Sequence, residues 1–140
     1  MTQLITFADA LARLNKVAEG RTDHVYEPPA ADFFSGSCVN LAADGSGSCI
    51  VGTAFHAELT EAGLQPDDKN NAGGVFAMIT EVLVGRVTLT ARAFHLLESV
   101  QSKQDSGTPW GEAIADAVAY VNEYQPYAND TEAADLATLF

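Results

Sequence analysis

Cysteine and histidine side chains gather in one stretch of this chain, and they define the chemistry that the sequence could support. Cys38, Cys49 and His56 lie within residues 38–63, where a glycine-rich turn separates an expected strand from an expected helix. Together with His24 they have the donor atoms of a zinc site. A helix N-terminus also favours the thiolate form of a cysteine, so Cys49 at the start of a helix is a candidate nucleophile.

The spacing of these residues argues against both chemistries. On one helix, Cys49 and His56 would be seven residues apart, or about 10.5 Å along the axis, whereas two ligands of one zinc ion need donor atoms within about 4 Å of each other. No C-x2-C or H-x3-H pair occurs in the sequence, and residues 50–55 contain no arginine of the kind a tyrosine-phosphatase-like site needs. We therefore expect the cysteines to pack in the interior and predict no metal. A cysteine-dependent enzyme built on Cys49 is kept as an alternative.

The glycine-rich turn, Gly45-Ser46-Gly47-Ser48, offers backbone N–H groups at a helix start, where anions bind. Phosphate-binding loops also require a lysine followed by serine or threonine, or the glycine spacing of dinucleotide-binding folds. Neither pattern occurs here. We interpret the segment as a flexible turn and predict no cofactor.

Composition bounds the class of protein. The chain has 140 residues, of which 47% are hydrophobic and 19% charged, which is typical of one globular domain. It has no apolar run near the roughly 18 residues of a membrane span and no signal-peptide pattern at its start, so we expect a cytoplasmic protein that does not contact membranes. Seven Lys and Arg stand against nineteen Asp and Glu, a net charge of −12, and no cation follows Lys103. Nucleic-acid binders need cations to neutralise phosphates, so direct binding to DNA or RNA is not expected.

Apolar periodicity, caps and breakers predict a mostly helical α+β fold, with about five helices packed on a small two- to three-stranded antiparallel β element. Thr6 and Asp9 form a capping box for the first helix, and Gly20 ends it. Thr88 or Thr90 caps the fourth helix. We predict a compact domain over residues 1–125, followed by an acidic C-terminal tail or short helix over residues 126–140. The expected helices span residues 6–20, 49–62, 75–84, 88–105 and 109–125, and the expected strands span residues 23–27 and 37–42.

Four parts of the chain form a recognisable set: Tyr26, Cys38, Cys49-Ile50-Val51-Gly52, and the segment Gln101 to Ala113 with its pattern Q-x-x-Q-D-x-G-x-P-W-G-x-A. Together they resemble a group of small uncharacterised proteins from actinobacteriophages and their actinobacterial hosts. The resemblance covers residues 25–119. It implies a phage or prophage product that acts in the cytoplasm of the host bacterium, and it implies no activity.

The function we predict is non-enzymatic binding of a host or phage protein, or self-association. Glu112, Asp116 and Glu123 should share the outer face of the fifth helix, with Trp110 at its start as a packing anchor or a binding residue. Glu112 and Asp116 are also one turn apart, as an acid–base pair or Mg²⁺ ligands would be, but we interpret them as part of a solvated helix face. A second alternative is an inhibitor that mimics DNA. It would align six carboxylates on one surface: Glu112, Asp116, Glu123, Asp130, Glu132 and Asp135.

Overall fold

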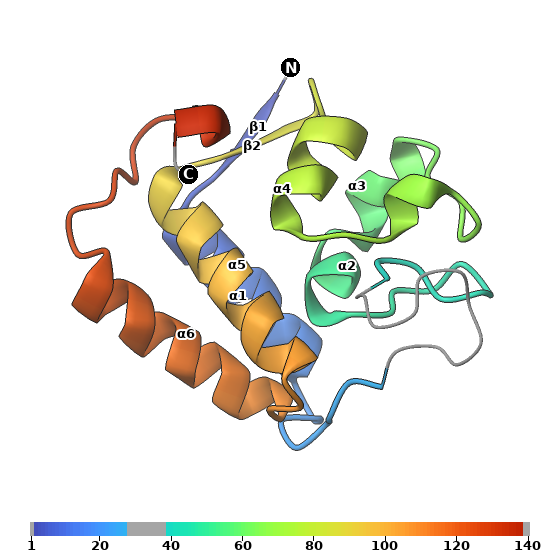
Figure 1. Cartoon of the computed structure of the whole chain (residues 1–140), viewed down its shortest axis with the longest axis horizontal. Coiled ribbons are helices and arrows are strands. Elements are labelled where there is room, and N and C mark those ends of the chain that lie inside the picture. The colour runs from blue at the N-terminus through green and yellow to red at the C-terminus, as the bar shows by residue number, and fades with distance from the viewer. Residues whose placement is uncertain (1, 28–38, 139–140) are drawn as a thin grey trace.

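A computed structural model describes residues 2–27 and 39–138. Cys38, Phe33 and Phe34 lie outside the described residues. Three long helices pack side by side, and shorter helical segments lie beside them (Figure 1). The long helices are α1 (Phe7–Ala18), α5 (Ala91–Asp105) and α6 (Trp110–Tyr124); the shorter segments are α2 (Ile50–Ala54), α3 (His56–Glu61), η1 (Lys69–Asn71), α4 (Val75–Ala77) and the π-helical turn η2 (Met78–Val82).

Helix α1 forms where the capping signals predict it. The Asp9 N–H donates to Thr6 Oγ1 over 3.3 Å, and the Thr6 N–H donates to Asp9 Oδ2 over 3.1 Å, so the capping box is complete. Leu14 and Ala18 turn into the core. Gly20 follows the helix with φ +76°, the left-handed conformation that glycine adopts without strain. The local prediction for this helix is confirmed.

The β element is parallel, so the antiparallel prediction is wrong. Strands β1 (Gln3–Ile5) and β2 (Val87–Leu89) pair in register, with Gln3 opposite Val87 and Ile5 opposite Leu89. Residues 6–86 separate them in sequence, and they include α1 and the shorter helical segments. A parallel pair needs a long crossover connection of this kind. Three residues per strand are too few to show an alternating pattern.

Residues 23–27, predicted as a strand, are irregular. Their backbone bonds go elsewhere: the carbonyls of Thr22 and His24 accept from the N–H groups of Gly111 and Trp110, over 2.8 and 2.9 Å. The segment therefore caps the start of α6 rather than joining a sheet.

The predicted strand over residues 37–42 is also wrong in its described part, which makes only single bridges, from Val39 to Ala72 and from Leu41 to Gly47. The turn after it forms as expected. Gly45 has φ +86°, and the Ser46 N–H donates to Asp44 Oδ1 over 3.0 Å.

Two predicted helices are interrupted. The helix expected over residues 49–62 breaks at Phe55, whose backbone (φ −112°, ψ +18°) separates α2 from α3, and Cys49 is the N-cap of α2. At the break, the carbonyl of Ala54 accepts from the Arg13 guanidinium over 3.2 Å. The helix expected over residues 75–84 is one turn of α-helix continued by the wider η2 turn.

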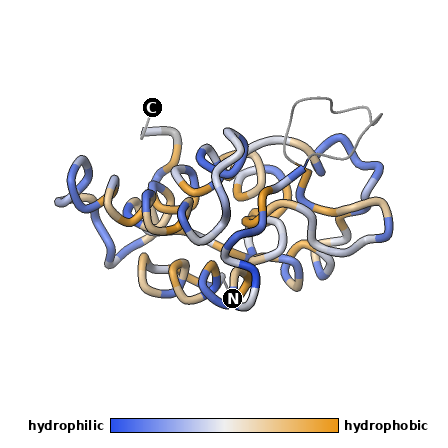
Figure 2. Tube along the Cα trace, turned by 90° about the horizontal axis from the view of Figure 1, so that it is seen from below, coloured by the Kyte–Doolittle hydropathy of each residue, from blue (hydrophilic) through white to orange (hydrophobic). Residues whose placement is uncertain are grey.

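The core lies where α1, α5 and α6 meet and extends under α2 to α4. Apolar and polar residues alternate along the helices (Figure 2), so each helix turns one stripe inward. In Figure 1, α6 lies on one side of the α1–α5 pair, and α2, α3 and α4 lie on the other. The largest fully buried side chains include Trp110, Phe55, Phe94, Leu14 and Leu96. Within the described residues, no helix is long and apolar enough to cross a membrane.

The acidic segment after α6 packs back onto the domain. We call residues 126–138 the C-terminal strap; it ends in the 3-10 turn η3 (Leu136–Thr138) and runs toward the two strands (Figure 1). The Ala134 N–H donates to the carbonyl of Leu89 in β2 over 2.8 Å, and Leu136 is buried. In its described part the strap is therefore packed on the domain, and it contains one short 3-10 turn.

Candidate functional site

Cys49 lies at the start of α2, as predicted, but its thiol is completely covered. Its side chain is 0% exposed and packs against Tyr26. The Gly52 N–H donates to Sγ over 3.3 Å, and Sγ lies 3.6 Å from Asn40 Oδ1. The sulfur therefore acts as the N-cap acceptor of the helix, and a substrate would reach it only if the surrounding segments opened.

The histidine of the same segment is directed to another group. His56 Nε2 lies 2.8 Å from the carbonyl oxygen of Gly45, so the ring closes the glycine-rich turn against α3. Of the four zinc ligands considered from the sequence, Cys38 lies outside the described residues. Within residues 2–27 and 39–138, no three His, Cys, Asp or Glu side chains are close enough together to hold a metal ion.

The segments that carry the phage-type resemblance contact one another. Buried Gln104 on α5 accepts from the Ile50 N–H at the start of α2, with 2.7 Å between Oε1 and N. A Cβ added at Gly52 would lie 2.4 Å from the carbonyl oxygen of Asn40, and one at Gly111 would lie 2.7 Å from Thr22 Cβ. These residue types are therefore needed for close packing.

A second buried amide, Asn71, holds the loop beside α2. Its Oδ1 accepts from the Leu41 N–H over 2.7 Å, and its Nδ2 donates to the Leu41 and Pro66 carbonyls, over 2.9 Å in each case. Sequence reasoning missed both Gln104 and Asn71, because a polar residue in a helix or loop pattern gives no sign of being buried.

Trp110, the proposed anchor or binding residue, is only 1% exposed. Its ring lies 4.5 Å from the His24 ring in an edge-on contact and 4.8 Å from the Arg21 guanidinium. The residue thus joins the start of α6 to the irregular segment before it. A partner could not reach the indole in this arrangement.

The exposed side of α6 carries acidic and aromatic residues together. The spacing of four residues places Glu112, Asp116, Tyr120 and Tyr124 along one line of the helix, with Glu123 beside them. Tyr120 is 44% and Tyr124 62% exposed, and their rings are 5.1 Å apart. We call these five residues the α6 face. The prediction missed its two tyrosines, although they continue the same four-residue spacing.

A hollow of 380 Å³ borders the α6 face and is lined by Tyr120 together with His95, Glu98 and other α5 residues. Partial burial raises the pKa of Glu98 and lowers that of His95. Both shifts have the same cause, since removal from water disfavours the charged form of each group. A positive charge in this hollow would oppose the shift of Glu98 and favour its charged form.

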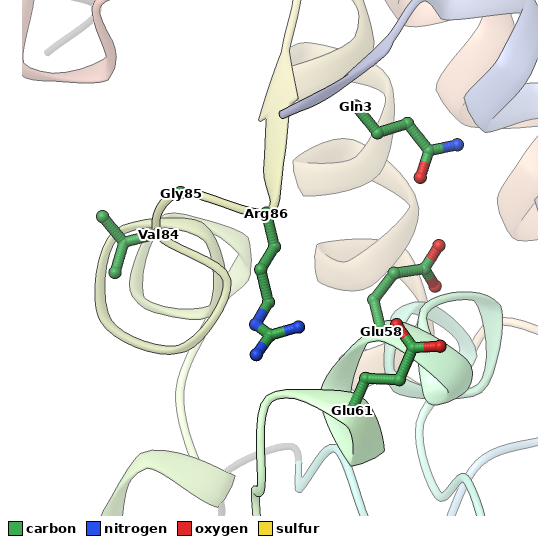
Figure 3. Close-up of a pocket in the computed structure, with 6 residues that line it drawn as sticks. All are labelled: Gln3, Glu58, Glu61, Val84, Gly85 and Arg86. Atoms are coloured by element: carbon green, nitrogen blue, oxygen red, sulfur yellow. The ribbon is translucent and has the colours of Figure 1, made fainter. Parts of the chain in front are cut away.

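A larger hollow, of 690 Å³, lies on another part of the surface (Figure 3). Arg86 extends from the start of β2 toward α3, which carries Glu58 and Glu61. Glu58 is held by Arg13 through two short bonds, of 2.8 and 2.9 Å, and this pairing lowers the pKa of Glu58. Val84 forms part of the rim.

Comparisons of the chain with known protein families, with curated proteins and with solved structures give no match. The phage-type resemblance therefore stays a prediction.

Proposed function

We propose that this chain is a non-enzymatic protein-binding factor and that its α6 face contacts a basic surface of a host or phage protein. The observation that carries this proposal is the α6 face itself: carboxylates and exposed tyrosines share one stripe of a helix that has no basic residue in its last turn. Tyrosine is enriched at the energetic centres of protein interfaces, and it orders little flexible side chain on binding.

The charge pattern of α6 favours a cationic partner. Glu112 lies in the first turn, where the helix dipole stabilises a negative charge. Glu123 lies in the last turn, where the same dipole opposes it by about 0.3–1 kcal/mol. A positively charged partner would relieve that repulsion, and the nearby Tyr120 and Tyr124 rings could accept a lysine or arginine above their faces.

One of the six carboxylates that a DNA mimic would align on its surface is already bonded within the fold. Asp130 is half-buried, and its Oδ1 accepts from the Phe7 N–H over 2.8 Å and from Thr90 Oγ1 over 2.7 Å. It therefore has a structural role in the described fold. The enzyme alternative on Cys49 is opposed by the burial of the thiol, since a catalytic cysteine must meet its substrate.

The test is affinity capture from an actinobacterial lysate with the full chain as bait, at low and high salt. Glu123→Gln and Tyr124→Ser each change the α6 face, and Asp67→Asn is the matched control because it removes one exposed carboxylate from a distant loop. We expect the α6 variants to lose a protein that the wild type and the control retain, and we expect that binding to weaken with salt. If the same protein is retained by all four baits, the α6 face is not the binding surface.

A further inference from the structure

We propose that two copies of this chain associate through the hollow of Figure 3, with Val84 at the centre of the contact and Arg86 of each copy paired with Glu61 of the other. The proposal is independent of the α6 face, which lies on the other side of the α1–α5 pair (Figure 1).

An exposed apolar side chain, Val84, lies beside the hollow. Val84 is 69% exposed on the turn that joins η2 to β2, which bends at Gly85 with φ +78°. It stands between two hollows: the polar one, of 690 Å³, and a smaller one, of 330 Å³. The smaller hollow is lined mainly by apolar side chains, among them Ile79, Val87 and Leu136. An exposed apolar side chain beside an apolar hollow is self-complementary under two-fold symmetry. Val84 of each copy can then pack against the apolar hollow of the other.

Two opposite charges lie near Val84. Arg86 and Glu61 are both exposed and line the same hollow from different elements (Figure 3). In the described part of the chain the one ion pair within 4.0 Å joins Arg13 to Glu58, so neither Arg86 nor Glu61 is neutralised within its own copy. A two-fold axis near Val84 brings each arginine to the glutamate of the other copy and forms two ion pairs from one kind of contact.

The charges of this surface favour a second copy over another partner. A molecule with a net charge of −12 repels its own kind, so self-association needs a surface that supplies its own cation. The α6 face supplies none and would repel a copy. The hollow combines a cation, a free carboxylate and an exposed aliphatic side chain, which is the combination that a self-complementary contact requires.

Analytical ultracentrifugation over a concentration series tests the proposal at physiological salt. We expect the wild type to dimerise, and we expect Arg86→Glu and Glu61→Arg each to weaken the dimer at least tenfold. The double variant E61R/R86E should regain most of the affinity because the pair is restored with reversed polarity. Lys69→Glu is the matched control: it changes the net charge as Arg86→Glu does, at an exposed site away from the hollow, and should leave the dimer within about twofold.

Val84→Asp provides a second measurement that does not depend on the ion pairs, and it should abolish the dimer. Circular dichroism of each variant shows that the fold is kept. A wild type that stays monomeric at high concentration would overturn the proposal. So would a dimer that the single charge reversals leave intact, or one that the double variant fails to restore.

Discussion

Replacing Asp130 with alanine should destabilise the protein by about 2–3 kcal/mol, although the residue belongs to an acidic segment that the sequence presents as a tail. One carboxylate oxygen joins two helix starts: it accepts from the Phe7 N–H at the first residue of α1 and from the hydroxyl of Thr90, the N-cap of α5. A hydrogen bond to a charged group contributes about 1.5–3 kcal/mol. A carboxylate at a helix N-terminus adds about 0.3–1 kcal/mol through the helix dipole.

The hydrogen-bond and helix-dipole contributions together give a range of stabilising free energy, and we take its lower part for two reasons. The two bonds share one oxygen, so their contributions are not independent. Asp130 is also half-buried, so water can reach the Phe7 N–H and the Thr90 hydroxyl after the carboxylate is removed. A loss of about 2–3 kcal/mol remains, which is a large share of the 5–15 kcal/mol that stabilises an ordinary domain.

Urea unfolding followed by fluorescence measures this loss directly, because the chain has a single tryptophan, Trp110, and it is buried. With a urea dependence of about 1–3 kcal/mol per M for small proteins, the midpoint for Asp130→Ala should fall by about 1 M with an unchanged slope. Asp130→Asn keeps an acceptor without the charge and should lose less. Glu132→Ala removes an exposed carboxylate from the same strap and should change stability by less than about 0.5 kcal/mol.

Equal stabilities of Asp130→Ala and Glu132→Ala would refute the reasoning. That result would mean that the strap is attached too loosely for its contacts to stabilise α1 and α5, and the predicted acidic tail would then describe the segment better. A fall in the slope together with the midpoint would indicate partial detachment of the strap before global unfolding.

Three further predictions follow from other parts of the fold. Gly52→Ala should destabilise by about 3 kcal/mol or more because the new Cβ meets a backbone carbonyl, whereas Gly74→Ala, with open space around its Cβ, should change urea stability little. The pKa of Glu58 is lowered by Arg13. The Glu58 carboxylate should therefore stabilise the fold fully above its ordinary pKa of 4.5 and lose this effect as the pH falls through the lowered pKa of the folded state. The difference in unfolding free energy between wild type and Glu58→Gln should shrink below about pH 4. Iodoacetamide should label Cys49 slowly in the native protein and rapidly in urea, as peptide-level mass spectrometry would show; rapid native labelling would instead favour the thiol enzyme.

Local signals in the sequence were enough to predict the long helices. Thr6 and Asp9 complete the capping box of α1, Thr90 caps α5, and Gly107 follows α5 with φ +91°. Each of these features depends on residues within one turn of a helix end, so the sequence alone contains the necessary information.

The β element and the broken helix depend on contacts between distant segments. Residues 23–27 alternate as a strand does, but the carbonyls in and beside this segment bond to the start of α6, which follows more than 80 residues later. The break at Phe55 coincides with a bond from Arg13 on α1 to the Ala54 carbonyl. Tertiary contacts of this kind override local preference, and no pattern within the segment itself reveals them.

The sequence was enough to predict the carboxylates of the α6 face but not its tyrosines. Glu112 and Glu123 are exposed on α6 and Asp116 is half-buried there, on the side away from the core. Their binding role stays a prediction. Tyr120 and Tyr124 were missed because tyrosines in an amphipathic helix are as consistent with the core as with the surface. Exposure decides between these environments, and it depends on how α6 packs against α5.

Salt separates the two proposed interactions, because their electrostatics differ in sign. Binding of a basic partner to the α6 face draws on attraction between opposite net charges, so added salt screens it and weakens the complex. Dimerisation through Val84 brings together two molecules that each carry −12. Salt screens that long-range repulsion more than it weakens the short Arg86–Glu61 contacts, which lie partly out of water in the interface. Added salt should therefore leave the dimer unchanged or strengthen it while it releases the basic partner. A single salt series on the wild type, followed by ultracentrifugation and by capture, would show the two dependences diverging; if both interactions weaken in parallel, one surface accounts for both.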